Sequence, residues 1–133
     1  MKRTAFALLM IALAFIALPA CKKSSGTSEA GLAVETTPAN QSNNLNILGP
    51  DFPLKVEITS TMPPSGVKIV VTAAKDGSSD PAFFTATNTT TAPQNNYTIT
   101  NTPSGVTCVV TVTITSLTKT SNVWTGSYRY SMK

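Results

Sequence analysis

The feature that most constrains this chain is a long alternation of apolar and polar residues in its second half. Between residues 106 and 117 the apolar positions are Val106, Cys108, Val110, Val112 and Ile114, and threonine occupies most of the positions between them. In a β-strand, residues two apart lie on the same face, so this period places the apolar set on one side. The pattern therefore predicts a half-buried strand over residues 106–117.

The same period recurs at residues 54–59 and 67–73, where Leu54, Val56 and Ile58 open the first run. Three further segments, 82–88, 96–100 and 123–132, bring the total to about six strands. No helical period of useful length follows the N-terminal region. Only 12% of the residues are charged, and helix-favouring Glu, Lys, Leu and Arg are scarce. The sequence therefore predicts an all-β fold, a small antiparallel β-sandwich of six to seven strands.

A weak internal repeat lies within this set of strands. Residues 64–67 read Pro-Ser-Gly-Val, and residues 103–106 read the same. Each copy is followed by Val-Val-Thr, at 70–72 and at 109–111. Each half is either a duplicated strand, turn and strand, with glycine supplying the positive φ of a tight turn, or a chance reuse of common turn residues. Two units do not predict a repeat array.

The stretch from Tyr97 to Tyr130 resembles the last three strands of immunoglobulin-like and fibronectin type III-like modules. It contains Tyr-Thr-Ile at 97–99, the Pro-Ser-Gly corner, the long Val/Thr strand, a polar turn at 118–122 and a closing aromatic strand. The resemblance covers roughly a third of the domain and lacks the Cys…Trp…Cys arrangement of antibody domains. It implies an immunoglobulin-like architecture and does not imply a function.

The N-terminus has the pattern of a secretory signal peptide. Lys2 and Arg3 precede an unbroken apolar run from Ala5 to Ala20. A basic segment followed by an apolar segment predicts a helical signal peptide over residues 1–20. The apolar run is shorter than the ~18 or more residues that a membrane-spanning helix needs. The run ends in Leu18-Pro19-Ala20-Cys21, which resembles the lipobox of bacterial lipoproteins, although Pro19 departs from the usual small residue.

The lipobox resemblance implies that Cys21 becomes the mature N-terminus and carries a diacylglyceryl thioether, which only a thiol can form. Two or three acyl chains anchor a protein stably in a lipid bilayer, whereas one chain is marginal. Lys22 after the cysteine resembles the outer-membrane sorting pattern of Gram-negative lipoproteins. We therefore expect an envelope protein anchored in the outer membrane through Cys21. An ordinary secreted protein with a free cysteine is the alternative.

Residues 21–49 are expected to be the lipidated cysteine and a flexible linker, and residues 50–133 the β-sandwich domain. The linker is rich in Ser, Thr, Asn and Gly, and such a segment cannot bury enough apolar surface to offset its chain entropy. As a random coil, its roughly 28 residues would span about 30 Å. The apolar patch Leu45–Leu48 is either the first strand or the approach to the domain.

Two candidate sites have conventional structural explanations. Cys108 lies on an apolar strand face, which predicts a small core residue, with intermolecular pairing as the alternative. A catalytic thiol would need exposure and a base, and the chain has no histidine. The same absence excludes His-dependent triads and His-ligated metal sites. No cofactor is expected.

Asp76 and Asp80 are the close pair of acids in the predicted domain, within Lys-Asp-Gly-Ser-Ser-Asp-Pro at 75–81. This composition is typical of a loop. Glycoside hydrolysis would need two converging carboxyl groups, and calcium would need more carboxylates. We therefore expect a turn and no metal site, with weak calcium binding and a minor hydrolase as the alternatives.

Trp124, Tyr128 and Tyr130 lie on one face of the predicted strand 123–132, with Gly126 leaving a gap between them. If this face is exposed, the three rings are candidate ligand-contact residues, able to stack on sugars or to hold a protein partner. If it is buried, they close the core. The first alternative predicts a carbohydrate-binding module.

The net charge of +4 belongs mostly to the N-terminal region. From Gly49 onward the chain has six basic and four acidic residues. The net charge of the domain is therefore too small to favour a nucleic-acid partner. Taken together, these features predict a non-catalytic envelope lipoprotein. Its β-sandwich would serve as a binding or structural module for an unknown protein or polysaccharide partner, through sheet edges or end loops.

Overall fold

A computed structural model describes residues 28–43 and 45–133 of the chain. The strands are β1 (Val34–Thr37), β2 (Leu45–Ile47), β3 (Phe52–Ile58), β4 (Val67–Lys75), β5 (Phe84–Thr90), β6 (Gln94–Ile99), β7 (Thr107–Ser116) and β8 (Val123–Met132). The all-β prediction is confirmed, and the sandwich has eight strands where six to seven were expected. Within the described part of the chain, no helix has the length and apolar character needed to cross a membrane.

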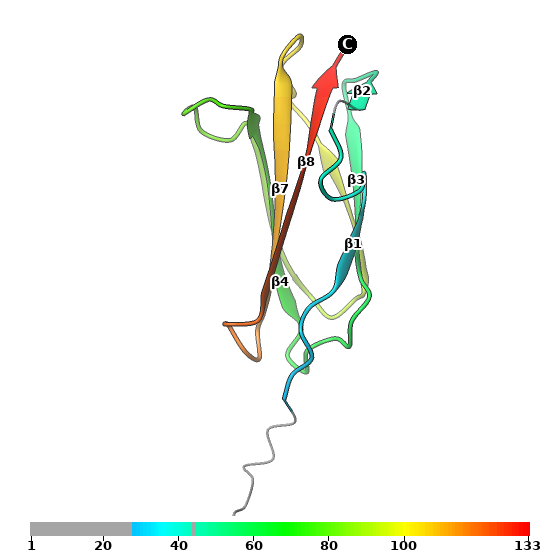
Figure 1. Ribbon diagram of the computed structural model, residues 1–133, viewed down its shortest axis with the longest axis vertical. Helices are drawn as coiled ribbons and strands as arrows, with labels where there is room; N and C mark the ends of the chain where they lie inside the picture. The colour runs from blue at the N-terminus through cyan, green and yellow to red at the C-terminus, as the bar shows by residue number, and fades with distance from the viewer. Residues whose placement is uncertain (1–27, 44) are drawn as a thin grey trace, which may run out of the picture.

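The strands form two sheets that face each other (Figure 1). One sheet has the order β1-β3-β6, and the other has the order β2-β8-β7-β4-β5. All neighbours are antiparallel except β2, which runs parallel to β8. The hairpins β4–β5 and β7–β8 stay within one sheet, whereas every other connection crosses to the opposite sheet. This arrangement is that of an immunoglobulin-like sandwich.

The predicted alternation sets the pairing across the larger sheet. In the register of β4 with β7, Ile69 lies opposite Ile114 and Val71 opposite Val112, and all four side chains are buried. Their neighbours in sequence lie on the outer face, where threonine side chains from β4, β5 and β7 stand next to one another. Val106 is the exception to the prediction, because it precedes β7 and is 37% exposed.

Both Pro-Ser-Gly turns use glycine in the left-handed region, as the sequence predicted. Gly66 has a φ of 82° and Gly105 a φ of 74°. Their surroundings differ, because a Cβ on Gly66 would lie 2.5 Å from the carbonyl oxygen of Thr90, whereas one on Gly105 would meet nothing within 4 Å. The two turns therefore share a backbone conformation and differ in packing.

The structure departs from the predicted linker over residues 21–49. β1 pairs with β3, with Val34 opposite Ile58, and β2 pairs with β8. Between these strands, the Gln41 amide donates to the Ser127 carbonyl. The described part of the predicted linker therefore belongs to the sandwich, which begins well before residue 50. Backbone pairing with neighbouring strands stabilises segments whose own apolar content is low.

Candidate functional site

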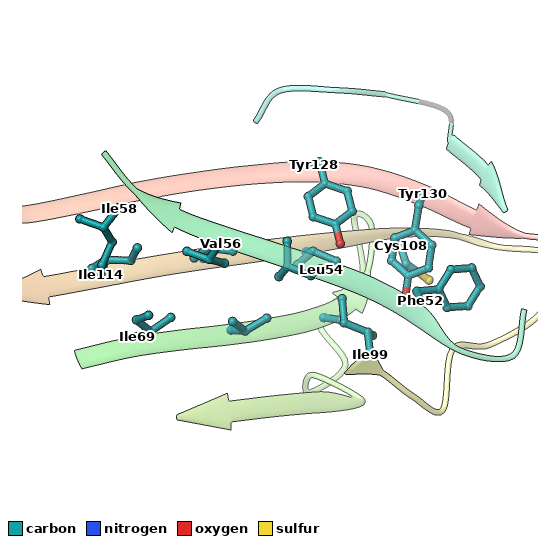
Figure 2. Close-up of a cluster of buried hydrophobic side chains, with 14 of the residues drawn as sticks. Phe52, Leu54, Val56, Ile58, Ile69, Ile99, Cys108, Ile114, Tyr128 and Tyr130 are labelled. Atoms are coloured by element: carbon teal, nitrogen blue, oxygen red, sulfur yellow. The ribbon is translucent and has the colours of Figure 1, made fainter. Parts of the chain in front are cut away.

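The closing strand β8 directs its two tyrosines into the core, as Figure 2 shows. Tyr128 is 3% exposed and Tyr130 is 1% exposed. The Tyr130 ring lies against Phe52 of the opposite sheet, with ring centroids 4.6 Å apart and an interplanar angle of 51°. Its hydroxyl shares a buried hydrogen bond of 2.7 Å with Thr102. The alternative of an exposed aromatic platform does not fit these two residues.

Trp124 occupies the gap that the sequence placed at Gly126. A Cβ on Gly126 would lie 2.3 Å from Cη2 of Trp124 and 2.8 Å from Oδ1 of Asn40. The indole ring therefore lies over the glycine, and Trp124 is half-buried against the core. Of the three candidate ligand-contact residues, only Trp124 keeps partial exposure, so together they do not form a binding face.

Burial also changes the acid–base properties of these phenols. Removal from water raises the pKa of Tyr128 well above its ordinary value, and the neighbouring Tyr130 raises it further. Burial raises the pKa of Tyr130 to about 12, although the hydrogen bond that Tyr130 shares with Thr102 acts in the opposite direction. Desolvation of the phenolate is the main cause in both cases. Both side chains are therefore neutral at physiological pH and unsuited to act as bases.

Cys108 is a core residue, as the sequence predicted. It is 0% exposed and lies opposite Tyr130 in the β7–β8 pair. Burial raises the pKa of its thiol, and Lys75 opposes that shift only in part. A thiol that is buried and protonated is a poor nucleophile.

The Asp76–Asp80 segment is a loop in which each of the two carboxylates forms an ion pair with a different basic side chain. Oδ2 of Asp76 lies 2.8 Å from Nε of Arg129, and Oδ2 of Asp80 lies 3.2 Å from Nζ of Lys75. The hydrogen bond from Lys75 lowers the pKa of Asp80. Across the described residues, no group of three or more His, Cys, Asp or Glu side chains is placed to hold a metal ion. The loop interpretation is confirmed, and the Arg129 pair is an addition that only the tertiary structure shows.

Asn122, in the turn between β7 and β8, fastens the beginning of the described chain. Its Oδ1 accepts a 3.1 Å hydrogen bond from the Leu32 amide, and its Nδ2 donates a 2.9 Å bond to the Ala30 carbonyl. The same Nδ2 also donates to the Glu29 carboxylate. No local sequence signal points to this contact, because its partners are about ninety residues apart in the chain.

Among the described residues, three edge strands carry no charge, and the two longer ones, β5 and β6, are open to further pairing. β5 is the last strand of the larger sheet, and its sequence Phe-Thr-Ala-Thr-Asn-Thr-Thr carries no charge. β6, at the edge of the smaller sheet, is likewise uncharged. Exposed edges present unpaired backbone groups, and proteins often protect them with Lys or Pro. Neither strand has that protection.

A shallow depression of about 440 Å³ lies where β1 ends beside β3. Its lining is largely apolar and includes Pro38, Ile47 and Pro53, with Lys55 as the charged residue. Lys55 is paired with Glu57 at 2.7 Å. This lining suits contact with an apolar group, and its residues do not include a nucleophile paired with a base.

No protein-family model and no curated protein sequence matches this chain. Among solved structures, the chain is similar to the CARDB domain of a Pyrococcus furiosus protein, which was crystallised in complex with di-metal ions. The alignment has a TM-score of 0.37 and 16% sequence identity, and it covers 77% of this chain and 94% of that domain. The immunoglobulin-like architecture of this chain stands on its own strand order and register.

Proposed function

We propose that the protein is a non-catalytic envelope lipoprotein, anchored through an acylated Cys21, whose β-sandwich binds or supports another protein or a polysaccharide at the membrane surface. The Lys22 that follows the cysteine favours the outer membrane of a Gram-negative bacterium. The signal peptide, Cys21 and Lys22 lie outside the described residues.

The observation that carries this proposal is the different placement of the two cysteines. Cys21 follows the lipobox pattern Leu-Pro-Ala, whereas Cys108 is sealed in the core of the sandwich. Only Cys21 is therefore a candidate for acylation. Two or three acyl chains on that residue would hold the protein stably on a bilayer.

The non-catalytic part of the proposal is supported by where the reactive groups lie. The Cys108 thiol and the phenols of Tyr128 and Tyr130 are buried, and their pKa values are raised. Asp76 and Asp80 are each paired with a cation. Buried groups with raised pKa values and carboxylates held by basic side chains are poor nucleophiles and bases, which supports a non-catalytic role.

The uncharged β5 edge supports the binding part of the proposal. An extended segment of a partner protein can add to such an edge through main-chain hydrogen bonds. A photo-crosslinking residue at Thr87 on β5 should then capture the partner in intact cells, and the same residue at Thr125 on β8 should not. Equal capture from both positions would argue against the β5 edge.

The anchor is tested by comparing two cysteine variants of the full chain in bacteria supplied with labelled palmitate. Cys21→Ala should lose the label and leave the membrane fraction. Cys108→Ala is the matched control and should keep both properties. A Cys21→Ala protein that stays labelled and membrane-bound would overturn the proposal.

A further inference from the structure

The described chain enters the sandwich at one defined end. The contacts of Asn122 with Ala30 and Leu32 fix this entry beside the β7–β8 turn. Figure 1 shows that turn at the lower end of the molecule, opposite the C-terminus. We call the three loops around this entry, residues 59–66, 91–93 and 117–122, the anchor end. The opposite end contains residues 48–51, 76–83 and 101–106.

The distance from the lipobox cysteine to the anchor end is short. Ser28, the first described residue, comes seven residues after Cys21. Seven residues reach at most about 25 Å when fully extended. The ten residues of β7 alone extend about 33 Å. A sandwich held through Cys21 therefore cannot stand on a bilayer with its opposite end down, because the tether is shorter than the domain.

The anchor end carries an exposed basic side chain. All three aspartates of the chain, Asp51, Asp76 and Asp80, lie at the opposite end, where Arg129 pairs with Asp76 and Lys75 pairs with Asp80. The loops of the anchor end contain no acidic residue, and they carry Lys119, which is exposed. Glu29, at the entry, is bound by Asn122. An anionic lipid surface would attract Lys119.

The anchor end also exposes an apolar side chain. Leu117 is 42% exposed, and it lines a shallow hollow of about 420 Å³ with Ser65 and residues 89–91. An exposed leucine beside a lysine is suited to the boundary between lipid headgroups and acyl chains.

We propose that the anchor end docks on an anionic lipid headgroup surface, with Leu117 and Lys119 in contact, and that the opposite end projects away from the membrane. This docking deepens the proposed function and depends on acylation of Cys21. It gives the sandwich one orientation and leaves the β5 edge and the opposite end accessible to a partner.

The test uses the full lipidated protein in vesicles that contain phosphatidylglycerol and lipids with a nitroxide headgroup. A fluorophore is attached in two separate variants, at Thr120→Cys in the anchor end and at Ser79→Cys in the opposite end. Buried Cys108 should not compete for the label. We expect the label at residue 120 to be quenched several-fold more strongly than the label at residue 79. Equal quenching, or stronger quenching at residue 79, would overturn the docking.

Two pairs of matched variants identify the contacts. Lys119→Glu should lower the ratio of docked to undocked protein by at least about fivefold, because each basic residue near an anionic surface contributes about that factor. Lys133→Glu, at the C-terminus, should not. Likewise Leu117→Asn should weaken quenching at residue 120, and Leu48→Asn should leave it unchanged. If the members of each pair behave alike, these contacts are wrong.

Vesicle flotation separates failure of the docking from failure of the anchor. A protein that floats with the vesicles but shows equal quenching at both labels contradicts the docking alone. A protein that does not float contradicts the lipid anchor, and the docking with it.

Discussion

Tyr130 and Thr102 share a 2.7 Å hydrogen bond inside the core, which ties the last strand to the loop between β6 and β7. Thr102 is 8% exposed, so water cannot easily replace this contact. The bond satisfies a phenol that would otherwise be buried without a partner. It explains how an aromatic strand can turn inward in a small domain without a large energetic cost.

Tyr130→Phe should lower the free energy of unfolding by about 1 kcal/mol, because it removes this bond and leaves the Thr102 hydroxyl buried. Urea unfolding followed by Trp124 fluorescence measures the change. Tyr128→Phe is the matched control on the same strand face, and it should have a smaller effect. An equal loss in both variants would show that the Thr102 contact contributes nothing specific.

Stability should fall at alkaline pH. Unfolded tyrosine ionises near pH 10, whereas burial raises the pKa of Tyr130 to about 12 and that of Tyr128 further. The folded state therefore holds protons that the unfolded state releases, so this contribution is complete below about pH 10 and is lost as the pH rises through the folded pKa values. Tyrosinate absorbance should accordingly appear together with unfolding. Full tyrosinate formation near pH 10 in a folded chain would contradict the buried placement.

The two Pro-Ser-Gly turns should respond differently to the same substitution. Gly105→Ala forces alanine into a positive φ in open space, which should cost about 1 kcal/mol. Gly66→Ala adds a clash with the Thr90 carbonyl, so its cost should reach about 2–4 kcal/mol. Thermal unfolding of the two variants gives the comparison. Equal costs would mean that the Gly66 turn can move away from Thr90.

The chain from Ser28 should fold cooperatively, and a chain that begins at Gly49 should not. The shorter chain lacks β1 and β2 and leaves the β3 and β8 edges unpaired. It also loses Leu32, Val34 and Ile47, which pack against the core. Circular dichroism during urea unfolding distinguishes the two chains. Equal urea midpoints for the two chains would mean that the segment before Gly49 behaves as the flexible linker that the sequence predicted.

The strands in which apolar and polar residues alternate strongly were predictable, because the apolar residues of that pattern are the ones that the fold buries. Val67, Ile69, Val71 and Ala73 read as one face and are all fully buried. β1 was not predictable, since Val-Glu-Thr-Thr becomes a strand through its pairing with β3.

The candidate site shows the same limit of sequence interpretation. The pattern placed Trp124, Tyr128 and Tyr130 on one face but could not say whether that face was covered. Its burial depends on Phe52 in the opposite sheet and on Thr102 in a distant loop. The Asn122 contacts with Ala30 and Leu32 had no sequence signal, because an asparagine in a polar turn looks the same with or without a distant partner.

The central claim is the lipid anchor, and the intact mass of the protein extracted from bacterial membranes tests it most directly. The account predicts a chain that begins at Cys21 and carries the added mass of a diacylglyceryl group, with or without a third acyl chain. A mass that corresponds to unmodified Cys21, or to a chain that keeps residues 1–20, would contradict it.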